Sequence, residues 1–71
     1  MKVEIYYCGE WNYLPEASRL EEELKGKFSN VEVKLNVGSG GIFKVILDGN
    51  KIFDKASVKR FPYINEISKV I

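Results

Sequence analysis

A single cysteine, Cys8, is the one side chain of this 71-residue sequence that we expect to act as a nucleophile, since the chain has no histidine. Cys8 follows a run with strand-like alternation and precedes a run with strong helical periodicity. Backbone N–H groups at the beginning of a helix, together with the helix dipole, stabilise a thiolate. Such a thiolate can attack a disulfide, and a second cysteine three positions later can resolve the product. Here that position holds Trp11.

Cys8 and Trp11 each have two interpretations that the sequence leaves open. Cys8 is either the nucleophile of a one-thiol redox site or a small apolar residue that ends a buried strand, as free cysteines often are. Trp11 is either an anchor for a protein partner or a ring folded over the loop that protects or buries Cys8. The function therefore depends on how the loop between Cys8 and Tyr13 is built.

Composition excludes several classes of function. Eleven basic and ten acidic residues leave a net charge of +1, so neither nucleic acid nor an anionic membrane is expected as the main partner. One cysteine without histidine supports no metal site, and we expect no cofactor. The first residues lack the apolar core of a signal peptide, and no apolar run is long enough to span a membrane. A free thiol fits a reducing compartment, so we expect a cytoplasmic protein.

Alternation of apolar and polar residues predicts four strands. The pattern of two residues per repeat is typical of a half-buried strand, and Asp48-Gly49 is a strong signal for a hairpin turn. The expected strands are Lys2–Tyr7, Val31–Val37, Ile42–Leu47 and Lys51–Asp54.

Two helices are expected from apolar residues that recur every three or four positions. The first runs from about Leu14 to Lys27, with Pro15 in its first turn and Asn12 as a possible N-cap. Its expected buried stripe consists of Leu14, Ala17, Leu20, Leu24 and Phe28. A polar connection from Lys55 to Arg60 leads to the second helix, which is opened by Phe61-Pro62. The stripe of that helix is expected to be Ile64, Ile67 and Ile71.

The element order β-α-β-β-β-α predicts a single α/β domain over residues 1–71. A right-handed crossover makes the first two strands parallel, and the last two pair as a hairpin. We expect a two-layer sandwich with a four-stranded mixed sheet in the order 2-1-3-4 and both helices on one face. Cys8 would then lie at the carboxyl end of a central strand, where open α/β sheets bind ligands. The uncovered face, which includes Ile46, or an edge strand is expected to allow a homodimer.

Several segments resemble the selenoprotein W/T/H-like family, also called the Rdx family. The resemblance runs through the whole chain, and the order and spacing of the segments together make it specific. The segments are Val3-Glu4-Ile5-Tyr6-Tyr7-Cys8-Gly9, Tyr13-Leu14-Pro15-Glu16-Ala17, Leu20-Glu21-Glu22-Glu23-Leu24, Phe28, Gly40-Gly41-Ile42-Phe43-Lys44-Val45, Asp48-Gly49-Asn50-Lys51-Ile52-Phe53 and Lys59-Arg60-Phe61-Pro62.

The resemblance implies a thioredoxin-like fold and thiol redox work. In the family, the strand–loop–helix junction carries Cys-x-x-Cys or Cys-x-x-selenocysteine, and Cys8 matches the first of these residues. Trp11 replaces the second, so the resemblance implies a thiol oxidoreductase-like protein without its resolving residue. Cys8 is then the catalytic residue, forming mixed disulfides with a protein or a small thiol. The alternative is a non-catalytic interaction module that uses the same loop. The expected partner-binding residues are Gly9, Glu10, Trp11, Tyr13, Gly41 and Phe43.

Overall fold

The computed structural model describes all 71 residues and contains four strands and three helices. Their bounds are β1 (Lys2–Cys8), α1 (Leu14–Lys27), β2 (Glu32–Gly38), β3 (Phe43–Leu47), β4 (Asn50–Asp54), α2 (Lys55–Val58) and α3 (Glu66–Val70). All four expected strands are present. The short helix α2 stands where a polar connection was expected.

One mixed sheet in the order β2-β1-β3-β4 organises the molecule. β1 is parallel to β2 and antiparallel to β3, and β3 pairs with β4 as a hairpin. Asp48 and Gly49 have φ angles of 47° and 87°, the left-handed values that a type I′ turn requires at both central positions. The predicted sheet order and hairpin are therefore confirmed.

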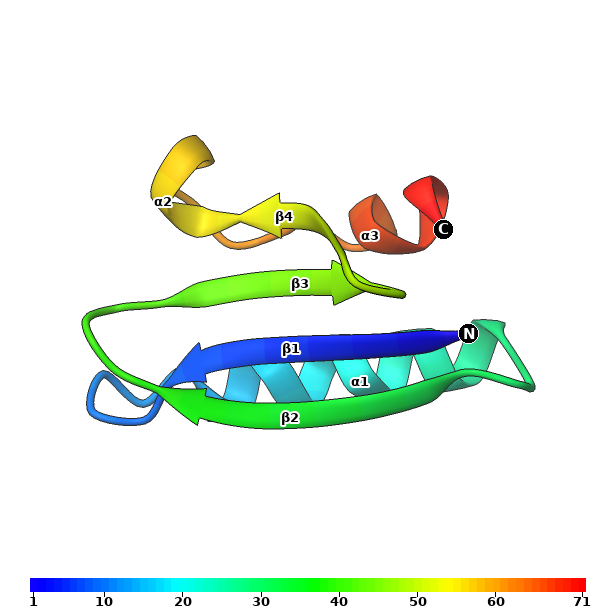
Figure 1. The fold of residues 1–71 in the computed structure, drawn as a ribbon, viewed down its shortest axis with the longest axis horizontal. Coiled ribbons are helices and arrows are strands. Elements are labelled where there is room, and N and C mark those ends of the chain that lie inside the picture. Colours follow the sequence, from blue (N-terminus) through cyan, green and yellow to red (C-terminus); the bar gives the residue numbers. More distant parts are fainter.

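The helices cover one face of the sheet. Figure 1 shows α1 across the back of β1 and β2, α2 and α3 beside β4, and no helix on the front face. The alternation of each strand sends its apolar side chains toward the helices. The resulting core comprises Val3, Ile5, Ala17, Leu20, Leu24, Phe43, Val45, Phe53 and Ile67. No helix is both long and apolar enough to cross a membrane.

Helix α1 buries a narrower stripe than the sequence predicted. Ala17, Leu20 and Leu24 are fully buried against the sheet. Leu14 was expected in this stripe but is 43% exposed, because it stands in the first turn, where the helix has just left the loop. The flanks of the helix carry ion pairs between side chains four residues apart, such as Glu21–Lys25 at 3.0 Å.

The C-terminal segment differs most from the prediction. Helix α3 begins at Glu66, not at Pro62, and Ile64 is 75% exposed instead of belonging to a buried stripe. Asn65 adopts φ 69°, a left-handed conformation that interrupts a helix before Glu66. Arg19 donates to the Pro62 carbonyl at 3.1 Å and holds the segment as a non-helical connection across α1. Pro62 is buried there.

β4 is an irregular edge strand. Its register with β3 shifts between Val45 and Ile46, which face Phe53 and Lys51, so Ile52 is an extra residue that forms a bulge. At the end of β4, the Asp54 side chain accepts a hydrogen bond of 3.0 Å from the Ala56 N–H and caps α2. A bulge and a cap of this kind limit how far an edge strand can pair with another chain.

Candidate functional site

Cys8 is the last residue of β1, at the carboxyl end of a central strand, and its side chain is fully buried. Its Sγ accepts a hydrogen bond of 3.3 Å from the backbone N–H of Trp11, the residue three positions later. It forms no disulfide. The structure therefore directs an N–H group at the sulfur, and the Cys8 side chain has no contact with solvent.

A tight turn links Cys8 to α1. Asn12 donates to the Gly9 carbonyl at 3.2 Å, and Tyr13 donates to the Cys8 carbonyl at 3.0 Å. Asn12, expected as a possible N-cap, adopts φ 58° inside this turn, and the N-cap position belongs to Tyr13 without a side-chain hydrogen bond. The Gly9 N–H donates to the Gly38 carbonyl at 3.1 Å, which extends the pairing of β1 with β2 into the loop. These bonds fix the position of the Trp11 N–H.

The Trp11 indole packs directly on the backbone of Gly41. A Cβ placed on Gly41 would lie 2.5 Å from ring atom Cζ3 of Trp11, so no side chain fits between them. Gly41 also has φ 79°, which L-residues rarely adopt. Trp11 remains 57% exposed on its other side. The contact therefore joins the loop after β1 to the connection between β2 and β3.

A row of edge-to-face aromatic contacts connects the loop between Cys8 and Tyr13 to the core. Successive ring centroids are 5.9 Å apart for Trp11–Tyr13, 4.7 Å for Tyr13–Phe61, 5.2 Å for Phe61–Phe43 and 6.4 Å for Phe43–Phe53. This geometry is the one that aromatic quadrupoles prefer. The row leads from the exposed Trp11 into the core at Phe43 and Phe53.

Lys55 brings a positive charge to this row, which the sequence did not reveal. Its Nζ lies 5.4 Å from the ring centroid of Tyr13 and 5.3 Å from that of Phe61, close enough for cation–π attraction to both. Lys55 makes none of the ion pairs of the structure. Nothing local in the sequence could have paired Lys55 with Tyr13, because the fold alone brings them together.

The expected site residues occupy different places. Gly9 and Glu10 are exposed in the loop, and Trp11 and Gly41 meet beside Cys8. Phe43 was expected to bind a partner, but it is fully buried in the core and offers no surface to one. Its contact with Phe61 makes it a support of the loop instead. No group of three or more His, Cys, Asp and Glu residues is placed to hold a metal ion.

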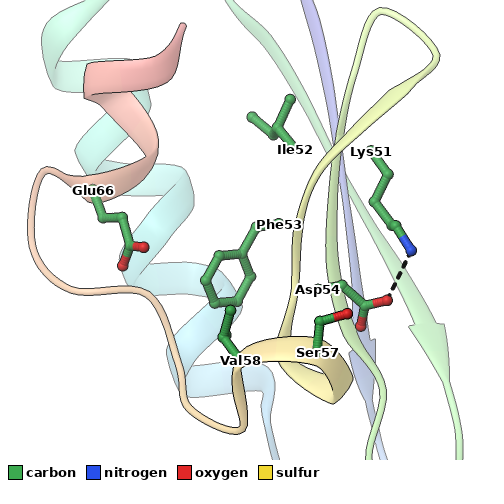
Figure 2. Close-up of a pocket in the computed structure, with 7 residues that line it drawn as sticks. All are labelled: Lys51, Ile52, Phe53, Asp54, Ser57, Val58 and Glu66. Atoms are coloured by element: carbon green, nitrogen blue, oxygen red, sulfur yellow. Dashed lines mark hydrogen bonds and ion pairs between the residues drawn. The ribbon is translucent and has the colours of Figure 1, made fainter.

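A pocket of about 280 Å³ lies away from Cys8, along β4 and between α2 and α3. Figure 2 shows its lining: Lys51, Ile52, Phe53, Asp54, Ser57, Val58 and Glu66. Lys51 donates to Asp54 at 2.9 Å, and this hydrogen bond, with that from the Ala56 N–H, lowers the pKa of Asp54. Both charges are therefore already engaged within the chain.

A cluster of Arg60, Tyr63 and Glu66, the last of which also lines this pocket, fixes the connection from α2 to α3. Arg60 makes a bidentate ion pair with Glu66, with N–O distances of 2.7 and 3.0 Å. Its guanidinium carbon lies 4.1 Å from the centroid of the Tyr63 ring. The hydrogen bond from Arg60, followed by that from the Tyr63 N–H, lowers the pKa of Glu66. Hydrogen bonding to Glu66 raises the pKa of Arg60. The cluster thus holds the segment that runs alongside β4.

The matches to known proteins extend over nearly the whole chain. A family model described as the Rdx family matches residues 2–71. The crystal structure of a selenoprotein W-related protein from Vibrio cholerae is 30% identical, with a TM-score of 0.91, and the match covers 96% of this chain and 88% of that one. A crystal structure from Bordetella parapertussis is 26% identical, with a TM-score of 0.88, and covers 96% and 89%. No curated protein sequence gives a significant match.

Proposed function

Because the chain belongs to the Rdx family, we propose that it is a monothiol redox protein in which Cys8 forms mixed disulfides with a small thiol or a protein partner. The observation that supports this most is the 3.3 Å hydrogen bond from the Trp11 N–H to the Cys8 sulfur. This bond holds a backbone donor beside the atom that would take part in the exchange. A cysteine at a strand end that faces a helix N-terminus is a common setting for a reactive thiolate.

The proposed reaction is thiol–disulfide exchange. The Cys8 thiol first gives its proton to solvent, and the thiolate attacks one sulfur of a disulfide offered by the partner. The bond between Cys8 and that sulfur forms as the partner's own S–S bond breaks, and the other sulfur leaves as a thiolate. Trp11 has no sulfur to carry out the second exchange. A further thiol from solution must therefore release Cys8, which suits the reducing cytoplasm.

The burial of Cys8 means that the loop must open before the sulfur can react. The Trp11 indole rests on Gly41, and this contact joins the loop to the connection that follows β2. A partner that draws the exposed indole away from Gly41 would loosen the loop around the sulfur. In this proposal, Trp11 controls access to Cys8 through its side chain and positions a hydrogen-bond donor through its backbone.

The rate of Cys8 alkylation in the folded protein tests the proposal. We expect a native reaction through local opening, measured with iodoacetamide and mass spectrometry, that is faster than global unfolding allows. Trp11→Ala removes the ring but keeps the N–H, so it should speed alkylation at least several-fold. Trp11→Phe retains an aromatic ring over Gly41 and serves as the matched control. If Trp11→Ala reacts only at its global unfolding rate, the proposal fails.

A second cysteine at position 11 tests the geometry of the site directly. The Trp11 backbone N lies 3.3 Å from Sγ of Cys8, so the Trp11→Cys variant should form a reversible intramolecular disulfide. Thiols are counted by mass spectrometry in the gel-filtered monomer after mild oxidation. Ser57→Cys adds a thiol on α2 and should keep both thiols free. Two free thiols in Trp11→Cys would mean that the loop lacks the geometry that a dithiol relative requires.

A non-catalytic interaction module is the second candidate, and one observation favours it. Cys8 is fully buried, whereas Trp11 is 57% exposed at the rim of the loop. In that case the loop docks a protein through its aromatic surface, and the thiol serves only packing. The alkylation experiment separates the two candidates, because this module predicts labelling of Cys8 only when the whole domain unfolds.

A further inference from the structure

We propose that two copies of this chain associate through the free edges of their β2 strands, joining the two four-stranded sheets into one continuous sheet. The proposal concerns a surface distant from the thiol chemistry and does not depend on it. It rests on three features of β2: an uncovered edge, the direction of its backbone groups and the order of its charges.

The edge of β2 is open along its whole length. β2 has seven residues, pairs only with β1 and runs in register without a bulge. Figure 1 shows it at the margin of the sheet with no segment beyond it. Val37, near its end, is 70% exposed. An edge strand that is long, regular and uncovered offers a template for pairing with another chain.

The direction of the backbone groups follows from two hydrogen bonds. The Glu32 N–H donates to the Met1 carbonyl at 2.8 Å, and the Gly38 carbonyl accepts from Gly9 at 3.1 Å. The backbone N–H and C=O groups of the even-numbered residues of β2 therefore point toward β1. Because the pattern alternates along a strand, the odd-numbered residues Val33, Leu35 and Val37 direct their N–H and C=O groups to the free edge. In the register that the charges favour, Val33 pairs with its equivalent and Leu35 pairs with Val31 of the second copy, while Val37 lies beyond the second copy's β2.

The order of the charges selects one register. A two-fold axis at Val33 makes the strands antiparallel, and Val33 exchanges both hydrogen bonds with its equivalent. Glu32 then faces Lys34 of the second copy at a non-hydrogen-bonded position, where side chains come closest. Moving the axis to Lys34 would place two lysines opposite each other. Moving it to Leu35 would leave Lys34 opposite Asn36, without an ion pair. Charge complementarity thus favours the axis at Val33.

Helix α1 presents a compatible flank above this edge. Arg19 and Glu23 contact Pro62 and Asn65, so they mark the flank toward the C-terminal segment. The other flank, toward β2, carries Ser18, Glu21 and Lys25, by the helical repeat. The two-fold axis makes the two α1 helices antiparallel, which brings Glu21 toward Lys25 of the second copy. Glu21 and Lys25 already pair within each helix at 3.0 Å, so the two facing flanks carry balanced charges and do not repel each other.

Charge reversal at β2 tests the proposal. Sedimentation velocity is measured in reductant over a concentration series, so that no Cys8 disulfide contributes. We expect a reversible dimer of the wild type. Glu32→Lys and Lys34→Glu each turn two attractive pairs into repulsive ones, and each should raise the dimer dissociation constant about tenfold. Mixing the two variants should restore association, because each then supplies the charge that the other needs.

Two further variants keep the test decisive. The double variant Glu32→Lys/Lys34→Glu exchanges the charges and should dimerise like the wild type, even if one single variant folds poorly. Lys51→Glu makes the same charge change on β4, the other edge, and should leave the dissociation constant unchanged. A wild type that is monomeric into the millimolar range would overturn the proposal. So would a dimer that both single reversals leave intact, because it must use another surface.

Discussion

β2 and β4 are both edge strands, but the chain protects only one of them. β4 has a bulge at Ile52, and Asp54 caps the short helix that follows. The connection held by Arg60 and Glu66 then runs alongside the strand. β2 has no bulge, and the chain leaves it for β3 without returning. Both edges belong to a sheet with one core. Whether an edge strand is covered therefore depends on the path that the chain takes after it.

A substitution in the core, for which we expect the largest effect, tests whether both edge strands depend on that core. Leu20→Ala should lower the free energy of unfolding by ~2–5 kcal/mol, because Leu20 is fully buried under the sheet. We expect one cooperative urea transition by far-UV circular dichroism, with both edges lost together. Glu22→Ala, on the exposed side of α1, should change stability by less than ~0.5 kcal/mol. Separate transitions for the two edges would contradict a shared core.

Gly41→Ala probes the connection that leads the chain away from the bare edge. The variant combines φ 79° with a Cβ placed against the Trp11 ring, so it should cost ~1–3 kcal/mol. The matched control is Gly26→Ala in α1, where no atom lies within 4 Å of the added Cβ. That change should stabilise the protein by ~0.5–1 kcal/mol through helix propensity. Equal effects at both glycines in urea denaturation would show that the contact between loop and connection is unimportant.

Asp54→Ala should weaken only the protected edge. It removes the N-cap of α2 and the partner of Lys51, and a lost cap costs ~1 kcal/mol. Hydrogen exchange should quicken in β4 and α2 and stay unchanged in β2. Glu32→Ala removes a carboxylate from the bare edge and serves as the control in dilute, monomeric protein. Faster exchange spread evenly over the sheet would mean that α2 supports more than its own edge.

The smallest expected effect concerns pH. The hydrogen bond from Arg60 lowers the pKa of Glu66, so the folded state gains stability above the unfolded pKa of ~4.3 and loses it as pH falls through the lower folded value. Glu66→Gln should therefore be slightly less stable than the wild type at neutral pH. The difference in thermal midpoint should shrink as the pH falls below ~4.3 and through the lower folded pKa of Glu66. Glu22→Gln is the exposed control. A constant difference across this range would mean that the ion pair adds no stability.

The sheet could be predicted because its signals are local. Alternation in each strand and the Asp48-Gly49 turn carry their own geometry, so order and pairing followed from topology rules. The C-terminal segment could not be predicted, because its shape depends on distant contacts. Arg19 holds the Pro62 carbonyl, and the left-handed Asn65 delays the last helix to Glu66. A periodic pattern of isoleucines gave no sign of either.

The candidate site was only partly accessible to sequence reasoning. Cys8 and Gly41 could be found because their types and order match a family motif, and Trp11 because it stands where that motif has its second cysteine or selenocysteine. The burial of Cys8 and the proximity of Lys55 to Tyr13 could not, because both result from packing between residues far apart in the chain. The burial of the Phe43 side chain could not be predicted from the sequence either. Phe43 matched the motif, but the sheet turns its ring into the core.

Trp11 is the only tryptophan of the chain, and its indole rests on the backbone of Gly41 with Tyr13 edge-on beside it. The tryptophan fluorescence of the protein therefore comes from one position, in the loop that donates a hydrogen bond to the Cys8 sulfur. When the indole leaves Gly41 and enters water, its emission should shift to longer wavelength while the secondary structure is unchanged. The protein thus carries a built-in optical probe of loop opening, which can be followed in stopped flow without any added label.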